Sequence, residues 1–269
     1  GLAYSAYTDP PIDTVLESNT GVMICRMPNR YWHSGYKKRD YDDIRRFVNE
    51  CRAPALYTWE YLIHPFAEGN PFPPVLPRLY AEDARFLTSI EGFQGGYMQI
   101  SVMGVKKNEK LSGYVWAHPL LDHFRLYFRM KLYDDETRDI DQMLDEYYTR
   151  FYGSAGDAVR RFVEALEGRW CDQAVRQASG ALPYEYGDAT SMVWWEYLGT
   201  PEFIKKLQRM MASAKAAATP ESVYSRRVNL LDKGILQLII NNRKHYAGSD
   251  TAKLPPIPEI DVPVLDPVA

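Results

Sequence analysis

The chain carries Tyr57-Thr-Trp-Glu-Tyr61 at the end of a segment rich in aromatic and β-branched residues, and a proline-rich break from His64-Pro65 to Pro77 follows at once. Such residues favour a strand and prolines interrupt one, so we expect a strand over residues 55–62. The stretch sets one carboxylate among three aromatic rings where the strand ends. Carbohydrate sites use carboxylates and stacking rings, so we predict a sugar site at the mouth of a pocket.

The surrounding sequence predicts an α/β fold. Three further β-prone segments alternate with amphipathic helical patterns, and they lie near residues 2–8, 21–27 and 95–101. We expect one helix with Asp40 as its N-cap, and others around 79–90 and 120–132. Strands that alternate with helices imply right-handed crossovers and a parallel sheet. Residues 1–133 thus predict four β/α units, half of a TIM-type (β/α)8 barrel.

The pattern becomes helical after the predicted sheet, and we assign residues 134–250 to a helical bundle appendage. Thr200-Pro201-Glu202 and Thr219-Pro220-Glu221 each place a capping threonine before a proline at the first helical position. The Trp194-Trp195 pair is interpreted as core or interdomain packing. Residues 251–269 are proline-rich and predict an extended tail.

The composition argues against several classes of partner. The 269 residues are 46% hydrophobic, enough for a substantial core, and the formal net charge is −3. The longest Lys/Arg block is the three residues Lys37-Lys38-Arg39, so we expect no nucleic acid. No apolar run approaches the ~18–20 residues that cross a bilayer, so we expect no membrane span. The start at Gly1 lacks an initiator Met and a signal-peptide pattern, and we expect upstream sequence to be missing.

Neither the cysteines nor the histidines predict a metal site. The three cysteines are far apart, with neither metal spacing nor a C-x-x-C pair, and we interpret Cys25 and Cys51 as buried free thiols. His118 and His123 are five residues apart, and no H-E-x-x-H motif occurs. We predict no metal and no cofactor.

In parallel α/β barrels the active site forms where the strands end, and this rule selects the candidate site residues. Glu60 is the first candidate for a proton donor or electrostatic stabiliser, and a salt-bridged acid is the alternative. Asp9 is the second carboxylate, although Asp-Pro-Pro is also an ordinary turn. The candidate sugar-positioning residues are Tyr7, Arg26, His33, Trp59, Tyr61, His64 and Gln99.

Side-chain parity constrains this choice. Successive strand residues face opposite sides, so Tyr57, Trp59 and Tyr61 share one face while Thr58 and Glu60 share the other. In a regular strand with Glu60 in the pocket, Trp59 would pack beneath helices. We favour the alternative, in which a bulge or the strand's end lets both side chains reach the mouth.

Two further candidates have structural alternatives. Arg26 ends an otherwise apolar strand and needs either a partner carboxylate or an anionic substrate group. We favour an internal ion pair with Asp9 or Glu60 over direct substrate contact. His33 belongs to the loop cluster Tyr31-Trp32-His33, which predicts either a stacking wall for a sugar or ordinary loop packing.

Several segments also match a known family in order and spacing. They are Leu2-Ala-Tyr4 with Thr8-Asp-Pro-Pro11, Tyr57-Thr-Trp-Glu-Tyr61 with Pro71-Phe-Pro-Pro74, Gly95-Gly-Tyr-Met-Gln99, and Lys131-Leu-Tyr-Asp134 with Tyr148 and Phe151-Tyr-Gly153. Together they resemble the domain of unknown function 4838. That family occurs in large, mostly exported bacterial proteins related to α-glucuronidases and to glycoside hydrolase family 163 endo-β-N-acetylglucosaminidases.

The resemblance implies an exported protein with a (β/α)8 barrel, of which this chain supplies the last four strands. The first half of the barrel, upstream of Gly1, would be its partner. We therefore expect a glycoside-hydrolase-like domain that acts on hexosaminide or glucuronide linkages of a glycan by carboxylate acid/base chemistry. The alternative is a non-catalytic carbohydrate-binding or structural module. The hydrolase requires Glu60 and Asp9 to face one cavity, whereas the non-catalytic module does not.

Overall fold

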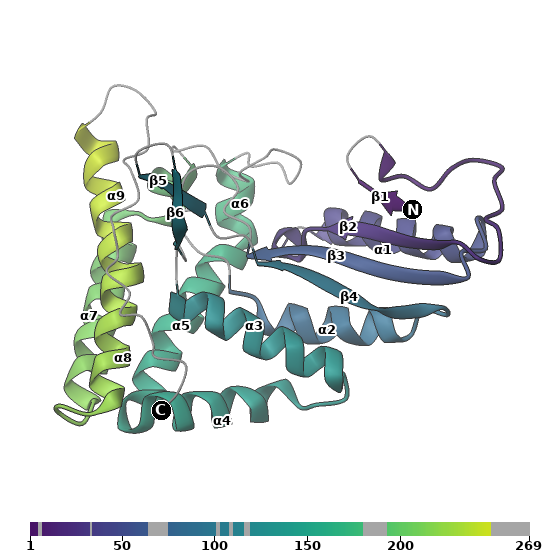
Figure 1. Cartoon of the computed structure of the whole chain (residues 1–269). Helices are drawn as coiled ribbons and strands as arrows, with labels where there is room; N and C mark the ends of the chain where they lie inside the picture. The colour runs from purple at the N-terminus through teal and green to yellow at the C-terminus, as the bar shows by residue number, and fades with distance from the viewer. Residues whose placement is uncertain are drawn as a thin grey trace.

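The computed structural model describes residues 1–4, 7–32, 34–63, 75–100, 103–107, 110–115, 119–179 and 193–248. Figure 1 shows a sheet that contains the N-terminal strand, helices α1 and α2 alongside it, and a group of upright helices that ends with α9. None of the helices in these ranges is long and apolar enough to cross a bilayer.

The sheet has four parallel strands in the order β1-β2-β3-β4. Their bounds are β1 Leu2–Ala3, β2 Gly21–Arg26, β3 Ala55–Ile63 and β4 Phe93–Ile100. The predicted α/β class and the parallel arrangement are confirmed. β1 ends at Ala3 and is therefore shorter than the predicted strand 2–8; the amide of Tyr7 bonds to the carbonyl of Tyr4 at 3.0 Å.

One face of the sheet is covered by helices. They are α1 (Ser34–Asn49), α2 (Pro77–Thr88) and α3 (Pro119–Asp134). In β2, Val22, Ile24 and Arg26 are buried while the residues between them are half-buried, as expected for a strand covered on one side. Asp40 lies inside α1 rather than at its start, so the predicted N-cap is wrong. Its carboxylate instead accepts hydrogen bonds from Arg26 and from the hydroxyl of Tyr31.

An antiparallel hairpin follows the sheet and was not predicted. It consists of β5 (Met103–Lys107) and β6 (Lys110–Val115). The polar residues between two β-prone runs are a hairpin signal that the sequence does contain. The described ranges hold an open sheet of four parallel strands, so the (β/α)8 barrel stays a prediction.

The second half of the described chain is helical, as its periodicity predicts. Short 3₁₀ turns occur at η2 (Pro28–Arg30) and η3 (Gly153–Ala155). The helices, with the π-helical η4 and η5, are α4 Ile140–Tyr152, α5 Gly156–Cys171, α6 Gln173–Ser179, η4 Val193–Leu198, α7 Pro201–Ala217, α8 Val223–Leu231, η5 Asp232–Leu236 and α9 Gln237–Gly248.

One of the two predicted threonine caps is present. The hydroxyl of Thr200 accepts a bond from a first-turn amide of α7 at 3.3 Å, as predicted. Thr219 does not cap α8. Glu221 has a φ of 57°, outside the helical region, and Ser222 caps the helix by accepting from the amide of Ser225 at 3.1 Å. The helix therefore starts later than the proline signal suggests.

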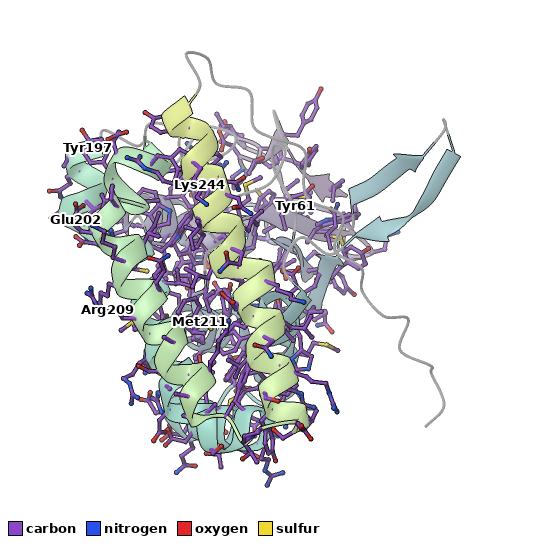
Figure 2. All side chains as sticks on the ribbon, turned by 90° about the vertical axis from the view of Figure 1, so that its left-hand side faces the viewer. Tyr61, Tyr197, Glu202, Arg209, Met211 and Lys244 are labelled. Carbon is purple, nitrogen blue, oxygen red and sulfur yellow. The ribbon has the colours of Figure 1, made fainter. Side chains whose placement is uncertain are left out.

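Two apolar cores hold the molecule together. The larger one joins α2 and α3 to the later helices and buries Trp194 and Trp195, so the prediction that this pair packs in a core is confirmed. Met211 of α7 points into it, whereas Arg209 on the same helix points outward (Figure 2). The smaller core lies between the sheet and the helices α1 and α2, and it contains the predicted buried thiol of Cys51.

Candidate functional site

Strand β3 separates its charged and aromatic side chains onto opposite faces. Trp59 pairs with Tyr97 of β4 and Glu60 pairs with Met98, in unbroken parallel register. Glu60 has no exposed surface, whereas Tyr57 on the other face is 38% exposed. The expectation that Trp59 and Glu60 reach one pocket mouth is therefore wrong. The strand keeps its alternation through both residues, and it is Glu60 that lies beneath the helices.

Two residues of α3 hold the Glu60 carboxylate. Arg129 donates from Nε to Oε2 at 2.8 Å and from Nη2 to Oε1, and the hydroxyl of Tyr133 donates to Oε1 at 2.6 Å. Both oxygens therefore meet donors in a place without solvent. A general acid must come within hydrogen-bond reach of the atom that it protonates. This geometry favours the alternative interpretation of Glu60, a salt-bridged acid.

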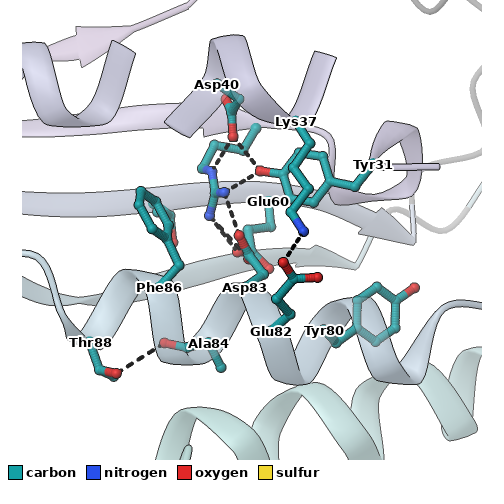
Figure 3. A network of polar contacts seen from close by, with 12 residues as sticks. Tyr31, Lys37, Asp40, Glu60, Tyr80, Glu82, Asp83, Ala84, Phe86 and Thr88 are labelled. Atoms are coloured by element: carbon teal, nitrogen blue, oxygen red, sulfur yellow. Dashed lines mark hydrogen bonds and ion pairs between the residues drawn. The ribbon is translucent and has the colours of Figure 1, made fainter. Parts of the chain in front are cut away.

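Arg26 extends this network to α1 and α2. Its Nε donates to Asp40 at 2.8 Å, its two Nη atoms donate to Asp83 at 3.2 and 2.6 Å, and Glu60 lies 3.6 Å from Nη1. The hydroxyl of Tyr31 contacts both Arg26 and Asp40. Figure 3 shows the carboxylates of Asp40, Glu60 and Asp83 converging between the sheet and the helices. The internal ion pair preferred for Arg26 thus exists with Glu60 and two further acids.

We call this set the buried network: Arg26, Tyr31, Asp40, Glu60, Asp83, Arg129 and Tyr133. Burial would raise the pKa of Asp83, but Arg26 and Arg129 more than reverse that effect and hold the pKa below its usual value. Burial would likewise lower the pKa of Arg26, and the surrounding acids, Asp83 first, raise it well above its usual value. Asp83 and Arg26 therefore stay charged and paired near neutral pH, which suits a brace between sheet and helices.

Asp9 lies in a different environment from Glu60. Its side chain is 64% exposed and pairs with Arg39 of α1 at 3.0 Å, which is also largely exposed. Glu60, by contrast, is enclosed on the helix-covered face of the sheet. The two carboxylates therefore do not face one cavity, and the convergence that would favour an enzyme is not seen.

The uncovered face of the sheet brings other predicted residues together. We call it the open face and define it by the side chains that β2, β3 and β4 turn away from the helices: Met23, Cys25, Tyr57, Trp59, Tyr61, Tyr97 and Gln99. Trp59 donates from Nε1 to Oε1 of Gln99 at 2.8 Å. Its ring centre lies 4.6 Å from that of Tyr97 and 6.4 Å from that of Tyr61. Trp59, Tyr61 and Gln99 are thus neighbours, as a sugar site requires.

The remaining candidates lie elsewhere or outside the described residues. Tyr7 is 81% exposed on the segment after β1, and no contact between its ring and the open face is seen in the described residues. Tyr4 is closer, since its ring centre lies 6.2 Å from that of Tyr61. His33 and His64 fall outside the described residues. Within the described ranges no three His, Cys, Asp or Glu side chains are placed to hold a metal ion.

Sequence reasoning missed several residues that the structure brings to these sites. Tyr97 has a clear signal, because it is two residues from Gln99 in one strand and shares its face. Arg129 and Tyr133 are four residues apart on one helix, a spacing that places both side chains on the same helix face. Nothing local links them to Glu60, since the partners are 69 and 73 residues apart along the chain.

Comparison with known families covers the sheet and the first helices. The model of the Domain of unknown function (DUF4838) matches residues 1–164. The chain belongs to this family. The matched part of this DUF4838 protein contains both the buried network and the open face. No curated protein and no solved structure matches the chain.

Proposed function

We propose that the open face of this DUF4838 domain binds carbohydrate. The observation that carries the proposal is the position of Trp59, whose ring is half-buried and held in place by Gln99 and Tyr97. An aromatic ring offers an apolar surface to the C–H face of a pyranose, and amide and phenol groups can bond to its hydroxyls. A ring that is already fixed loses little conformational entropy on binding.

The proposal is binding, not hydrolysis by Glu60 and Asp9. A glycosidase needs two carboxyl groups on either side of the scissile bond, ~5–5.5 Å apart in retaining enzymes and ~6.5–9.5 Å apart in inverting ones. Glu60 is enclosed by Arg129 and Tyr133, and Asp9 is exposed and paired with Arg39. The hydrolase activity that the family resemblance implies would therefore need carboxylates from another part of the protein.

We further propose that the sheet is half of a (β/α)8 barrel, which other strands of the same protein complete. The support is that all four strands run parallel and that α1, α2 and α3 lie on one face, as in the outer layer of such barrels. In that arrangement the open face lines the barrel interior. Trp59, Tyr61 and Gln99 then lie toward the strand ends, where barrels place their ligands.

The binding proposal is tested with the full chain on an array of neutral and acidic oligosaccharides, followed by calorimetric titration of the glycans it retains. Trp59→Ala is expected to weaken binding at least about tenfold, because it removes the stacking ring. Trp59→Phe keeps a ring but loses the bond to Gln99, and an intermediate affinity is expected.

Met130→Ala is the matched control, because Met130 is a 59% exposed apolar side chain on α3, on the helix-covered side of the sheet. Its glycan affinity should equal that of the parent. Retention of no glycan by the folded chain, or full affinity in folded Trp59→Ala, would overturn the proposed function.

A further inference from the structure

The open face is electrically neutral over its described part. Its members are methionine, cysteine, tyrosine, tryptophan and glutamine side chains, none of which is charged at neutral pH. Burial raises the pKa of the Cys25 thiol above its usual value. Burial and the neighbouring Cys25 likewise raise the pKa of Tyr61, so both groups are neutral near pH 7. No described side chain that the three strands turn to this face is ionic.

The cations at the same end of the sheet are turned away from this face. Arg26 ends β2 and is the residue that an acidic sugar would need, but its side chain has no exposed surface and is engaged by Asp40 and Asp83. Arg129 is equally enclosed against Glu60 and Asp83. The buried network therefore holds both guanidinium groups away from any ligand on the open face.

A carboxylate brought to the open face would lose water without gaining a cation. Burial of an unpaired charge is strongly unfavourable, whereas the C–H face of a neutral pyranose loses little on the same surface. The rings of Trp59 and Tyr97 would also present their electron-rich faces to an anion, which repels it.

We infer that the open face selects neutral pyranosides and discriminates against uronate-containing glycans, with Trp59 and Tyr97 as the specificity-determining residues. The inference rests on the proposed function and narrows the proposed ligand from carbohydrate in general to uncharged sugars. Because no described charge on the face takes part, binding should change little with ionic strength.

The test compares one glycan in two forms: the neutral array oligosaccharide that binds most tightly, and the same oligosaccharide oxidised to the uronate at C6. Calorimetric titration of the full chain in low and high salt should give an affinity for the neutral form at least about tenfold higher than for the uronate. Salt should leave the neutral affinity almost unchanged.

A charge introduced on the face provides a second measurement. Tyr97 is 49% exposed and adjacent to Trp59, so Tyr97→Arg should raise uronate affinity, and that gain should disappear in high salt. Tyr97→Gln is the control, since it loses the same ring without adding a charge, and it should not gain uronate affinity.

Three outcomes count against the inference. Uronate affinity equal to or above neutral affinity in the parent chain would overturn it while leaving carbohydrate binding intact. Equal uronate affinity in Tyr97→Arg and Tyr97→Gln would also overturn it, because charge on this face would then not control selectivity. Binding of neither form would overturn the proposed function together with the inference.

Discussion

The two faces of β3 carry opposite chemistry one residue apart. Glu60 is fully buried and meets Arg129 and Tyr133, whereas Trp59 lies on the open face beside Tyr97. The charged residue is therefore the internal one and the aromatic residue the accessible one, the reverse of the usual preference. A carboxylate at a strand end indicates a site only if its face is known, and parity alone does not say which face the helices cover.

The largest expected effect comes from removing a cation of the buried network. Arg129→Met should lower the free energy of unfolding by about 3–5 kcal/mol, because Glu60 and Asp83 would keep buried charges with one fewer partner. Chemical denaturation measures this value.

Arg150→Met is its control at the exposed pair with Glu146 on α4. The denaturation midpoint of that variant should match the parent, since exposed ion pairs contribute little. Equal stability of Arg129→Met and the parent would show that the buried network does not brace the sheet.

Glu167, a largely enclosed carboxylate outside the buried network, sharpens the comparison because it is less well paired than Glu60. Glu167 of α5 lies 3.5 Å from Arg78, which also contacts Asp141 at 2.7 Å and Glu164 at 3.7 Å. Burial raises the pKa of Glu167 from 4.5 to about 7; Arg78 opposes this effect and Glu164 adds to it. Glu60 has two arginines and a tyrosine, whereas Glu167 shares one arginine with two other acids.

A raised pKa in an acid means that the folded state binds the proton more tightly than the unfolded state. The contribution of Glu167 to stability should therefore be greatest below pH 4.5. It should be lost as the pH rises through about 7. The loss is at most about 3 kcal/mol. Glu167→Gln should remove this part of the pH dependence in denaturation series, whereas Glu202→Gln, at an exposed position of α7, should not. A pH profile of Glu167→Gln that parallels the parent would contradict this account.

The next largest effect on stability is expected where the sheet packs against α3. A Cβ at Gly96 would lie 2.5 Å from Oγ1 of Thr58 and 2.6 Å from the hydroxyl of Tyr133. Gly96→Ala should therefore destabilise the fold by about 1–3 kcal/mol.

Gly168 inside α5 is the matched control, because a Cβ there meets no atom within 4 Å. Gly168→Ala should raise stability by roughly 0.5–1 kcal/mol through helix propensity. Thermal or chemical denaturation of the two variants measures these changes in stability. Unchanged stability of Gly96→Ala would mean that β4 and α3 separate easily.

The smallest effect on stability is expected on the open face. Tyr97→Ala loses a partly exposed ring contact with Trp59 and should cost less than about 1.5 kcal/mol. Glycan affinity should nevertheless fall, because the ring belongs to the proposed site. A large loss of stability here would mean that the open face is core rather than a binding surface.

Much of the local structure is predictable from the sequence. The four parallel strands and the cap at Thr200 appear in the structure as predicted. Strand parity also gave the alternation of Trp59 with Glu60 that the structure has, although we favoured a bulge or strand end that would bring both to one mouth. The hairpin of β5 and β6 and the late start of α8 were missed, since weak turn signals and one residue with positive φ decided them. The catalytic pairing of Glu60 with Asp9 rested on an assumed shared face, which parity could not supply.

The sequence by itself determined where strands and helices form and that Trp59 and Glu60 lie on opposite sides of β3, because dihedral preferences and period-two spacing act over a few residues. Only the tertiary structure decided that the helices cover the Glu60 side and leave Trp59 accessible. That choice depends on Arg129, 69 residues further along the chain, because a buried carboxylate is stable only where distant groups bring it compensating charge.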